Sequence, residues 1–222
     1  MDARAIADQV RTALAAESDP VRAVGQQAYM KSDMPFYGVP VPRVRAITRT
    51  VAGRHLGDVA DVEAVARELW DDATRREERY AAIAATGLRP AVGRPELIPL
   101  HEYQARTGAW WDFVDEIAHR IADLLEACPQ LASAQVRTWM TADSLWLRRL
   151  AILSQLQRRD RTDAALLTDV IEANSADGEF FIRKAIGWAL RDYARTAPGW
   201  VRAFVEAHDL SPLSRREALK HL

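Results

Sequence analysis

The sequence predicts an all-α protein, a superhelical solenoid of antiparallel helix pairs with a concave binding face. Three observations favour this fold class. Apolar residues recur with the helical period in nearly every long segment, and no stretch alternates as a half-buried strand does. Proline or glycine separates many of these segments, and a similar helix recurs about every 35 residues.

Thirteen helices are expected in chain order. The first is amphipathic and acidic, with Asp2, Asp8 and Glu17, and lacks the continuous apolar run of a signal peptide or membrane span. Breakers between later segments include Pro90, Pro129, Gly178, Pro198 and Pro212. Short loops favour antiparallel neighbours. The expected helices are 2–16, 20–32, 41–54, 59–70, 74–86, 94–106, 110–127, 130–140, 144–158, 163–174, 179–194, 198–207 and 212–221.

Four of these helices resemble one another: ERYAAIAAT, AWWDFVDEIA, LWLRRLAILSQL and FFIRKAIGWAL. Their aromatic anchors, Tyr80, Trp111, Trp146 and Phe181, are spaced 31, 35 and 35 residues apart. Recurrence at this interval, with another helix between copies, is typical of stacked helical pairs such as HEAT repeats. We therefore expect one HEAT-like domain over residues 1–222, with an irregular helical bundle as the alternative.

Composition sets wide limits on function. A chain of 222 residues that is 49% hydrophobic can bury a large core. The net charge of -1 does not by itself indicate a nucleic-acid partner. The single cysteine, Cys128, cannot form an internal disulfide and fits a reducing compartment. We expect a soluble cytoplasmic protein.

Several familiar catalytic motifs are missing. There is no Gly-rich phosphate loop, no GxSxG turn and no HExxH. The histidines lack metal-ligand spacing: His55, His101, His119, His208 and His221. No metal and no cofactor are expected.

Two side chains near residue 110 lie off the expected buried face of their helix. The apolar stripe consists of Trp110, Phe113, Val114, Ile117 and Ile121. Trp111 and Asp115, four residues apart, share another face and can touch. Either they line a binding groove, or Trp111 packs under a neighbouring repeat while Asp115 caps a helix or pairs with an arginine.

The last repeat carries a second tryptophan off its stripe. Trp188 lies on the side of Lys184 and Arg191, away from the core positions Ile182, Ala185, Ile186, Ala189, Leu190 and Tyr193. Between the two repeats, LWLRRLAI places Arg148 and Arg149 at the equivalent position, and periodicity does not decide which of them faces the groove.

These residue types together fit a ligand that is cationic at its centre and anionic at its edges. Indole faces attract a cation, a carboxylate stabilises positive charge, and arginine binds phosphate. An N-alkylated purine nucleotide within DNA has this charge pattern. Basic clusters could contact phosphates or be ordinary solvated surface: Arg43, Arg45, Arg49 and Arg54; Arg158, Arg159 and Arg161; and Arg215, Arg216 and Lys220.

Long motifs across the chain resemble the AlkD family of bacterial alkylpurine DNA glycosylases. They are AYMKSDMPFYGVPVPRVR, RELWDDATRREERYAA, WWDFVD, DSLWLRRLAIL, EFFIRKAIGWALRDYA and LSPLSRREALKH. The resemblance implies HEAT-like repeats that wrap duplex DNA with a concave face. It implies hydrolysis of the N-glycosidic bond of cationic N3- or N7-alkylated purines, without the base flipping used by most glycosylases.

The family's site residues are carried over onto matching positions. Asp115 is the implied catalytic aspartate, Trp111 and Trp188 are cleft aromatics, and Arg149 matches the arginine of the WLxR motif. Tyr29 matches another cleft aromatic. Further DNA contacts are expected from Arg148, Lys184, Arg191, Arg215, Arg216 and Lys220.

This chain departs from some members of the family, which have polar residues where it has Pro40 and Val41. The expected partner is double-stranded DNA containing alkylated purines, bound by a monomer that has no membrane association. Two rival hypotheses are a non-catalytic HEAT-repeat DNA-binding protein and a protein-interaction scaffold.

Overall fold

The computed structural model describes all 222 residues, and every regular element in it is helical. The expectation of an all-α protein is confirmed, and each of the thirteen expected segments overlaps an α-helix. The chain divides into two compact units, Met1–Leu100 and His101–Leu222. The single domain and the superhelical concave face remain predictions.

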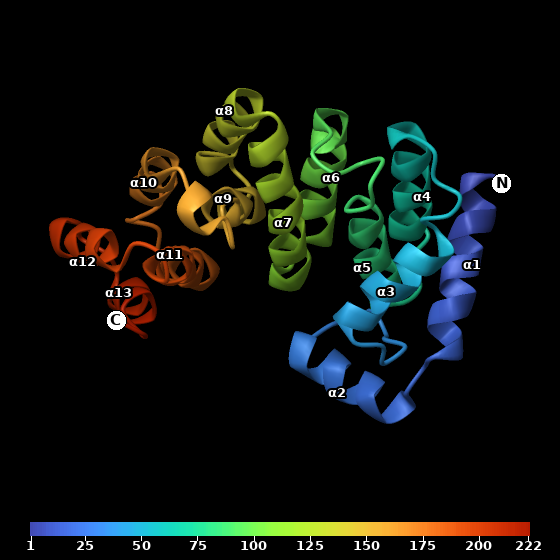
Figure 1. The fold of residues 1–222 in the computed structure, drawn as a ribbon. Helices are drawn as coiled ribbons and strands as arrows, with labels where there is room; N and C mark the ends of the chain where they lie inside the picture. The colour runs from blue at the N-terminus through green and yellow to red at the C-terminus, as the bar shows by residue number, and fades with distance from the viewer. The chain divides into compact units, whose positions relative to one another are not determined.

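The first unit is built around α5, which packs against α3 and α4, while α1 packs on α3 and α4 (Figure 1). Its core is formed by side chains such as Val62, Val65 and Ile83. Aspartate side chains cap the first backbone N–H groups of α1, α2 and α4. The elements are α1 (Ala3–Ala16), α2 (Pro20–Met30), α3 (Val41–Val51), α4 (Val59–Asp71), α5 (Arg76–Ala85) and the 3-10 turn η1 (Pro95–Leu97), after which α6 (Ile98–Gly108) begins.

Helix α2 differs from the other helices of this unit because none of its residues is buried. Val21, Val24 and Tyr29 are 87%, 71% and 73% exposed. Figure 1 shows α2 set apart from α1, α3, α4 and α5. Apolar packing therefore does not hold α2 in place.

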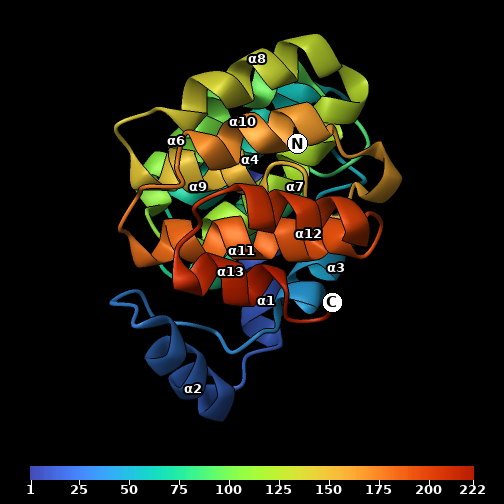
Figure 2. The same cartoon turned by 90° about the vertical axis from the view of Figure 1, so that its left-hand side faces the viewer.

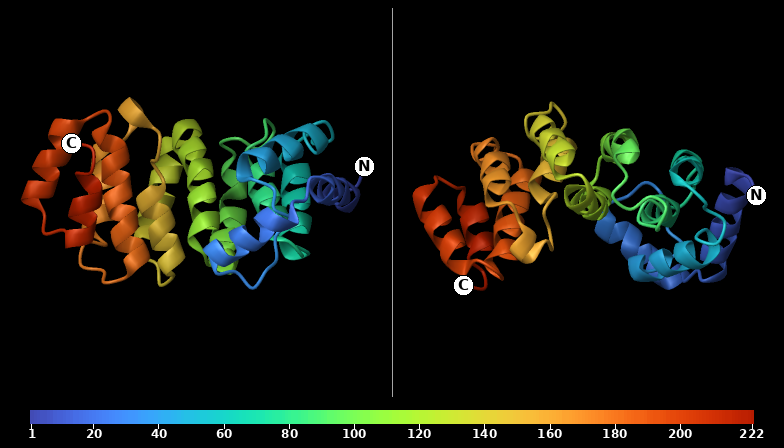
Figure 3. Two further views of the ribbon diagram at one scale, coloured as in Figure 1. Left: turned by 90° about the horizontal axis from the view of Figure 1, so that it is seen from below. Right: turned by 45° about the horizontal axis from the view of Figure 1, so that its top comes forward.

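In the second unit, two rows of helices follow the chain alternately. Helices α7, α9, α11 and α13 contact one another in that order (Figure 3), while α8 packs on α7 and α9, and α12 packs on α11 and α13 (Figure 2). This alternation is the helical-pair arrangement that the repeat predicts. The elements are α7 (Trp111–Ala127), α8 (Pro129–Met140), α9 (Leu145–Leu153), the 3-10 turn η2 (Arg159–Arg161), α10 (Ala164–Glu172), α11 (Phe180–Ala194), α12 (Pro198–Ala207) and α13 (Pro212–Ala218).

The largest error in helix boundaries falls on the expected helix 144–158, which ends at Leu153. Gln157 and Arg159 adopt left-handed backbone conformations, with φ of 65° and 56°. An α-helix cannot continue through such residues. The expected helix 212–221 is also shorter and ends at Ala218. No helix of the structure combines the length and apolar character needed to cross a membrane.

Candidate functional site

Asp115 and Arg149 form a bidentate pair between neighbouring helices. Each is the fifth residue of its helix, α7 or α9. Arg149 donates from Nε to Oδ1 of Asp115 at 2.9 Å and from Nη2 to Oδ2 at 3.0 Å. Its Nη1 donates to the carbonyl oxygen of Phe181 in α11 at 2.7 Å. One guanidinium thus joins three consecutive helices of the same row.

This pair is largely removed from solvent. The Arg149 side chain is 5% exposed and that of Asp115 is 14% exposed. Arg149 is hydrogen-bonded within the protein at all three of its nitrogens, so its guanidinium is not freely available to a ligand. Asp115 is paired with an arginine, as one of its two interpretations expected, and whether it also lines a binding groove stays a prediction. A ligand can reach Asp115 only through the 14% of its side chain that is exposed.

The surroundings of Asp115 bring its titration close to neutral pH. Burial raises the pKa of Asp115 to about 7, because the charged form loses hydration. The charge and hydrogen bonds of Arg149 oppose this shift, whereas the neighbouring carboxylates of Asp112 and Glu116 add to it. A carboxylic acid with such a pKa is a frequent feature of catalytic sites.

Both tryptophans expected off the buried stripes are partly exposed. Trp111 begins α7 one turn before Asp115, on the same side of the helix, and Trp188 lies within α11. The stripes themselves are confirmed: the buried residues are Phe113, Val114, Ile117 and Ile121 in α7, and Ile182, Ala185, Ile186, Ala189 and Leu190 in α11. There are two exceptions: Trp110 is only half-buried and precedes α7, and Tyr193 is partly exposed and packs its ring on Trp200.

An aromatic cluster lies where α7, α9 and α11 begin. The ring centroids of Trp110, Trp146 and Phe181 are 5.3 to 6.0 Å apart. The sequence repeat placed Trp111 in this series, and the structure shifts it by one residue to Trp110. That shift arises because Trp110 precedes α7 as its N-cap, in extended conformation, so helical spacing does not apply to it.

The cations beside Trp188 are paired within the protein. Glu217 of α13 contacts Lys184 Nζ at 3.0 Å and Arg191 Nη1 at 2.6 Å. The hydrogen bond from Lys184 is the main cause that lowers the pKa of Glu217, and Arg191 adds to it. α13 packs directly on α11 at Gly187, where a Cβ atom would collide with the Glu217 side chain. Glu217 was not found from the sequence, because no spacing rule relates it to residues on α11.

Two of the other expected DNA-binding arginines make hydrogen bonds within the second unit. Arg148 donates to the carbonyl oxygens of Ala142 and Asp143 and to the Asp177 carboxylate at 3.1 Å. Arg215 donates to the Val205 carbonyl oxygen at 2.7 Å. These contacts give both arginines a structural role in the second unit, and their expected contact with DNA stays a prediction.

Arg216 and Lys220 are exposed near the end of the chain, as is Arg215. Tyr29 is exposed on α2 of the first unit. The expected site residues are therefore brought together as two groups in the second unit, Asp115 with Arg149, and Lys184 with Arg191.

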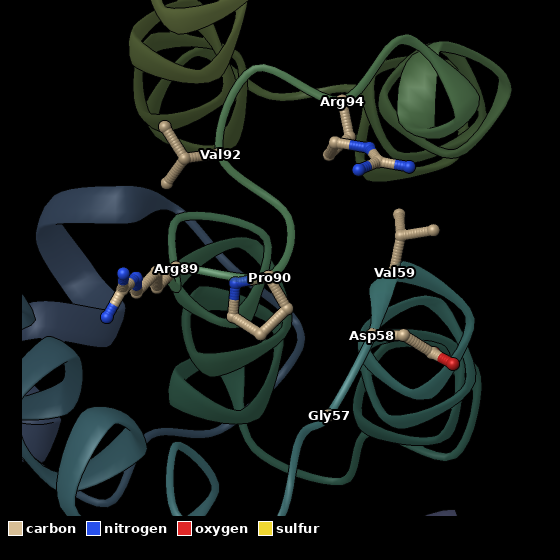
Figure 4. A pocket seen from close by; sticks show the side chains of 7 residues that line it. All are labelled: Gly57, Asp58, Val59, Arg89, Pro90, Val92 and Arg94. Atoms are coloured by element: carbon tan, nitrogen blue, oxygen red, sulfur yellow. The ribbon is translucent and has the colours of Figure 1, made fainter.

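The first unit contains a cavity of about 550 Å³ between loops (Figure 4). Arg94, at its edge, pairs with Glu96 at 2.7 Å, and Asp58 accepts a hydrogen bond from the backbone of Asp61. None of the expected site residues lines it. The lining residues are Gly57, Asp58, Val59, Arg89, Pro90, Val92 and Arg94.

Comparison with known proteins supports the family resemblance. No curated protein gives a significant match. Among solved structures, a predicted DNA alkylation repair enzyme from Enterococcus faecalis is 31% identical to this chain. The match covers 92% of this chain and 96% of that one, with a TM-score of 0.76. The family model for the DNA alkylation repair enzyme matches residues 10–222. The chain therefore belongs to the family of DNA alkylation repair enzymes.

Proposed function

We propose that the protein is a DNA glycosylase that hydrolyses the N-glycosidic bond of cationic N3- or N7-alkylated purines in duplex DNA, a step of base excision repair. The observation that supports this most is the Asp115 carboxylate. It is held bidentately by Arg149, lies on the same face of α7 as Trp111, and has a pKa of about 7. A DNA-binding protein or a scaffold has no need for such a group.

The chemistry requires only one carboxylate. An alkylated purine is positively charged and leaves as a neutral base, so no general acid has to protonate it. Ordinary glycosidases use a second carboxylic acid for that purpose. As the base departs, the sugar becomes oxocarbenium-like, and ionised Asp115 stabilises this positive charge and orients the attacking water.

Arg149 has a different role from the one expected. Because its guanidinium is buried and hydrogen-bonded at all three nitrogens, we assign it to fixing the orientation of Asp115. Trp111 and Trp188 shelter the sugar and favour its developing charge through cation–π contacts of roughly 0.5–2 kcal/mol each. Uncharged lesions gain nothing from this arrangement.

The DNA contacts divide into two classes. Arg216, Lys220 and Tyr29 are exposed and can meet the duplex directly. Lys184 and Arg191 are paired with Glu217, which competes with a phosphate for both cations. A concave superhelical face and a monomeric state belong to the same proposal.

Substrate choice tests the proposal. Duplex oligonucleotides carrying 7-methylguanine, 3-methyladenine or uracil are incubated with excess protein, and the released base is identified. We expect release of the cationic purines and none of uracil. Efficient uracil release would contradict the mechanism. Binding with a steep salt dependence but no base release would identify a DNA-binding protein, and absence of binding would identify a scaffold.

A further inference from the structure

The segment after α2 is anchored by a fully buried carboxylate. Glu77, in the first turn of α5, is 0% exposed. Its Oε2 accepts the N–H of Tyr37 at 2.9 Å, and its Oε1 accepts those of Gly38 and Val39 at 2.8 and 3.0 Å. Charge-assisted hydrogen bonds of this kind are roughly twice as strong as neutral ones.

Glu78 extends the anchor to the Tyr37 side chain. It is also 0% exposed, and its Oε1 accepts the Tyr37 hydroxyl at 2.8 Å. Burial and Glu78 raise the pKa of Tyr37, so the hydroxyl remains a donor. The backbone of Thr74 donates to the other oxygen of Glu78 at 2.9 Å. The two carboxylates lie at the N-terminus of α5, where the helix dipole favours negative charge.

The anchored segment in turn holds the start of α2. The Tyr37 carbonyl oxygen accepts the N–H of Asp19, the N-cap of α2, at 2.8 Å. The Gly38 carbonyl oxygen accepts Nη1 of Arg22 at 2.9 Å. Gly38 has a φ of +93°, and a Cβ atom there would collide with the Asp19 carbonyl oxygen. The backbone of Gly38 is therefore in direct contact with the backbone of Asp19, where α2 begins.

The other end of α2 is also tied by polar contacts. Gln27 donates to the Ser32 carbonyl oxygen at 3.1 Å, and Arg76 Nη1 donates to the Ser32 hydroxyl at 3.2 Å. Since α2 buries no residue, these hydrogen bonds take the place of a packed apolar face. An isolated helix of this length is marginal in water, so its direction depends on its anchors.

We propose that Glu77 is a positioning residue for DNA binding: through the 37–39 backbone it fixes the direction in which α2 presents Tyr29. This rests on the proposed function only in assigning Tyr29 to DNA. A merely structural Glu77 would affect stability and leave the contribution of Tyr29 to DNA affinity unchanged.

A double-mutant cycle tests the coupling. Affinity for an undamaged duplex is measured by fluorescence anisotropy for the wild type, Glu77→Gln, Tyr29→Ala and the double variant. In Glu77→Gln, the side-chain NH₂ group replaces one of the two carboxylate oxygens and cannot accept a hydrogen bond from the backbone. At least one of the three hydrogen bonds is therefore lost. We expect each single variant to weaken binding about fivefold, and the double variant to bind no more weakly than either one. Glu63→Gln, which removes an i,i+4 pair with Arg67 on α4, is the matched control and should bind as the wild type does.

Hydrogen exchange gives a second measurement. In the wild type, we expect slow exchange at the amides of Tyr37, Gly38 and Val39, and slower exchange in α2 when DNA is bound. In Glu77→Gln, or in Glu77→Asp if the former does not fold, exchange in α2 should quicken while that in α4 stays unchanged. The wild-type measurement alone overturns the proposal if those three amides exchange freely.

The proposal is also overturned if Glu77→Gln lowers Tm but binds DNA normally, or if the two single effects multiply in the double variant. These results are independent of base excision. Coupled DNA binding without release of 7-methylguanine would refute the glycosylase and leave the role of Glu77 standing. Release of 7-methylguanine without coupling between Glu77 and Tyr29 would refute the role of Glu77 and leave the glycosylase standing.

Discussion

The titration of Asp115 leads to a quantitative prediction for activity. Since the ionised carboxylate is the form that stabilises the sugar, the excision rate should follow the ionised fraction. With a pKa of about 7, that fraction rises from about one tenth at pH 6 to about nine tenths at pH 8. The single-turnover rate should therefore increase about tenfold between these pH values and level off above pH 8.

The assay measures release of 7-methylguanine from a duplex between pH 5.5 and 9, with spontaneous depurination subtracted and protein in excess over DNA. Binding is measured at each pH to separate affinity from chemistry. In Asp115→Asn the pH dependence should disappear together with most of the rate. A flat wild-type profile, or a rising limb that persists in Asp115→Asn, would refute the assignment of Asp115.

Arg149 provides a control within the same experiment. Its charge and hydrogen bonds lower the pKa of Asp115 against the effect of burial. Removing the charge in Arg149→Gln should therefore move the rising limb to higher pH. A limb that stays in place would mean that another group titrates.

Other predictions concern α13 and the end of the chain. Glu217→Gln should release Lys184 and Arg191, so that affinity for DNA rises. The slope of log K against log salt should become steeper by up to about 1.8, because each of two new phosphate contacts contributes about 0.9. An unchanged slope would show that these cations do not contact DNA. Gly187→Ala should lower the free energy of unfolding by about 1–3 kcal/mol, because α13 must shift. In thermal denaturation it should be compared with Gly199→Ala, whose new methyl group meets nothing within 4 Å, and equal stability of the two variants would contradict the close approach of α13. Arg216→Ala and Lys220→Ala should each reduce the salt slope by about 0.9 without changing the excision rate of bound DNA; a loss of rate at saturating DNA would place them nearer to the chemistry.

Much of the fold could be predicted from local patterns. Helical periodicity and proline positions located the thirteen helices, because both act within a few residues along the chain. The end of α9 could not be predicted, since the left-handed Gln157 and Arg159 are neither glycine nor asparagine. The stripe of α7 was predicted because its period is intrinsic to the helix, whereas Trp110 lies just outside the helix and broke the repeat register.

The candidate site could be predicted only residue by residue. Asp115 and Arg149 were both selected, yet their mutual bond depends on the packing of α7 against α9, which no single-helix pattern contains. For the same reason the ion pairs of Lys184 and Arg191 with Glu217 and the anchoring of α2 by Glu77 required the structure. A sequence identifies which residues are charged, but it does not show which residue each of them pairs with.

The most direct measurement of the central claim is the single-turnover release of 7-methylguanine from duplex DNA by the wild type and by Asp115→Asn at pH 8. At this pH the carboxylate of the wild type is mostly ionised. Rapid release by the wild type, and loss of most of that rate in a variant that binds DNA equally well, is the predicted result. Equal release rates in the two proteins would contradict the catalytic role of Asp115.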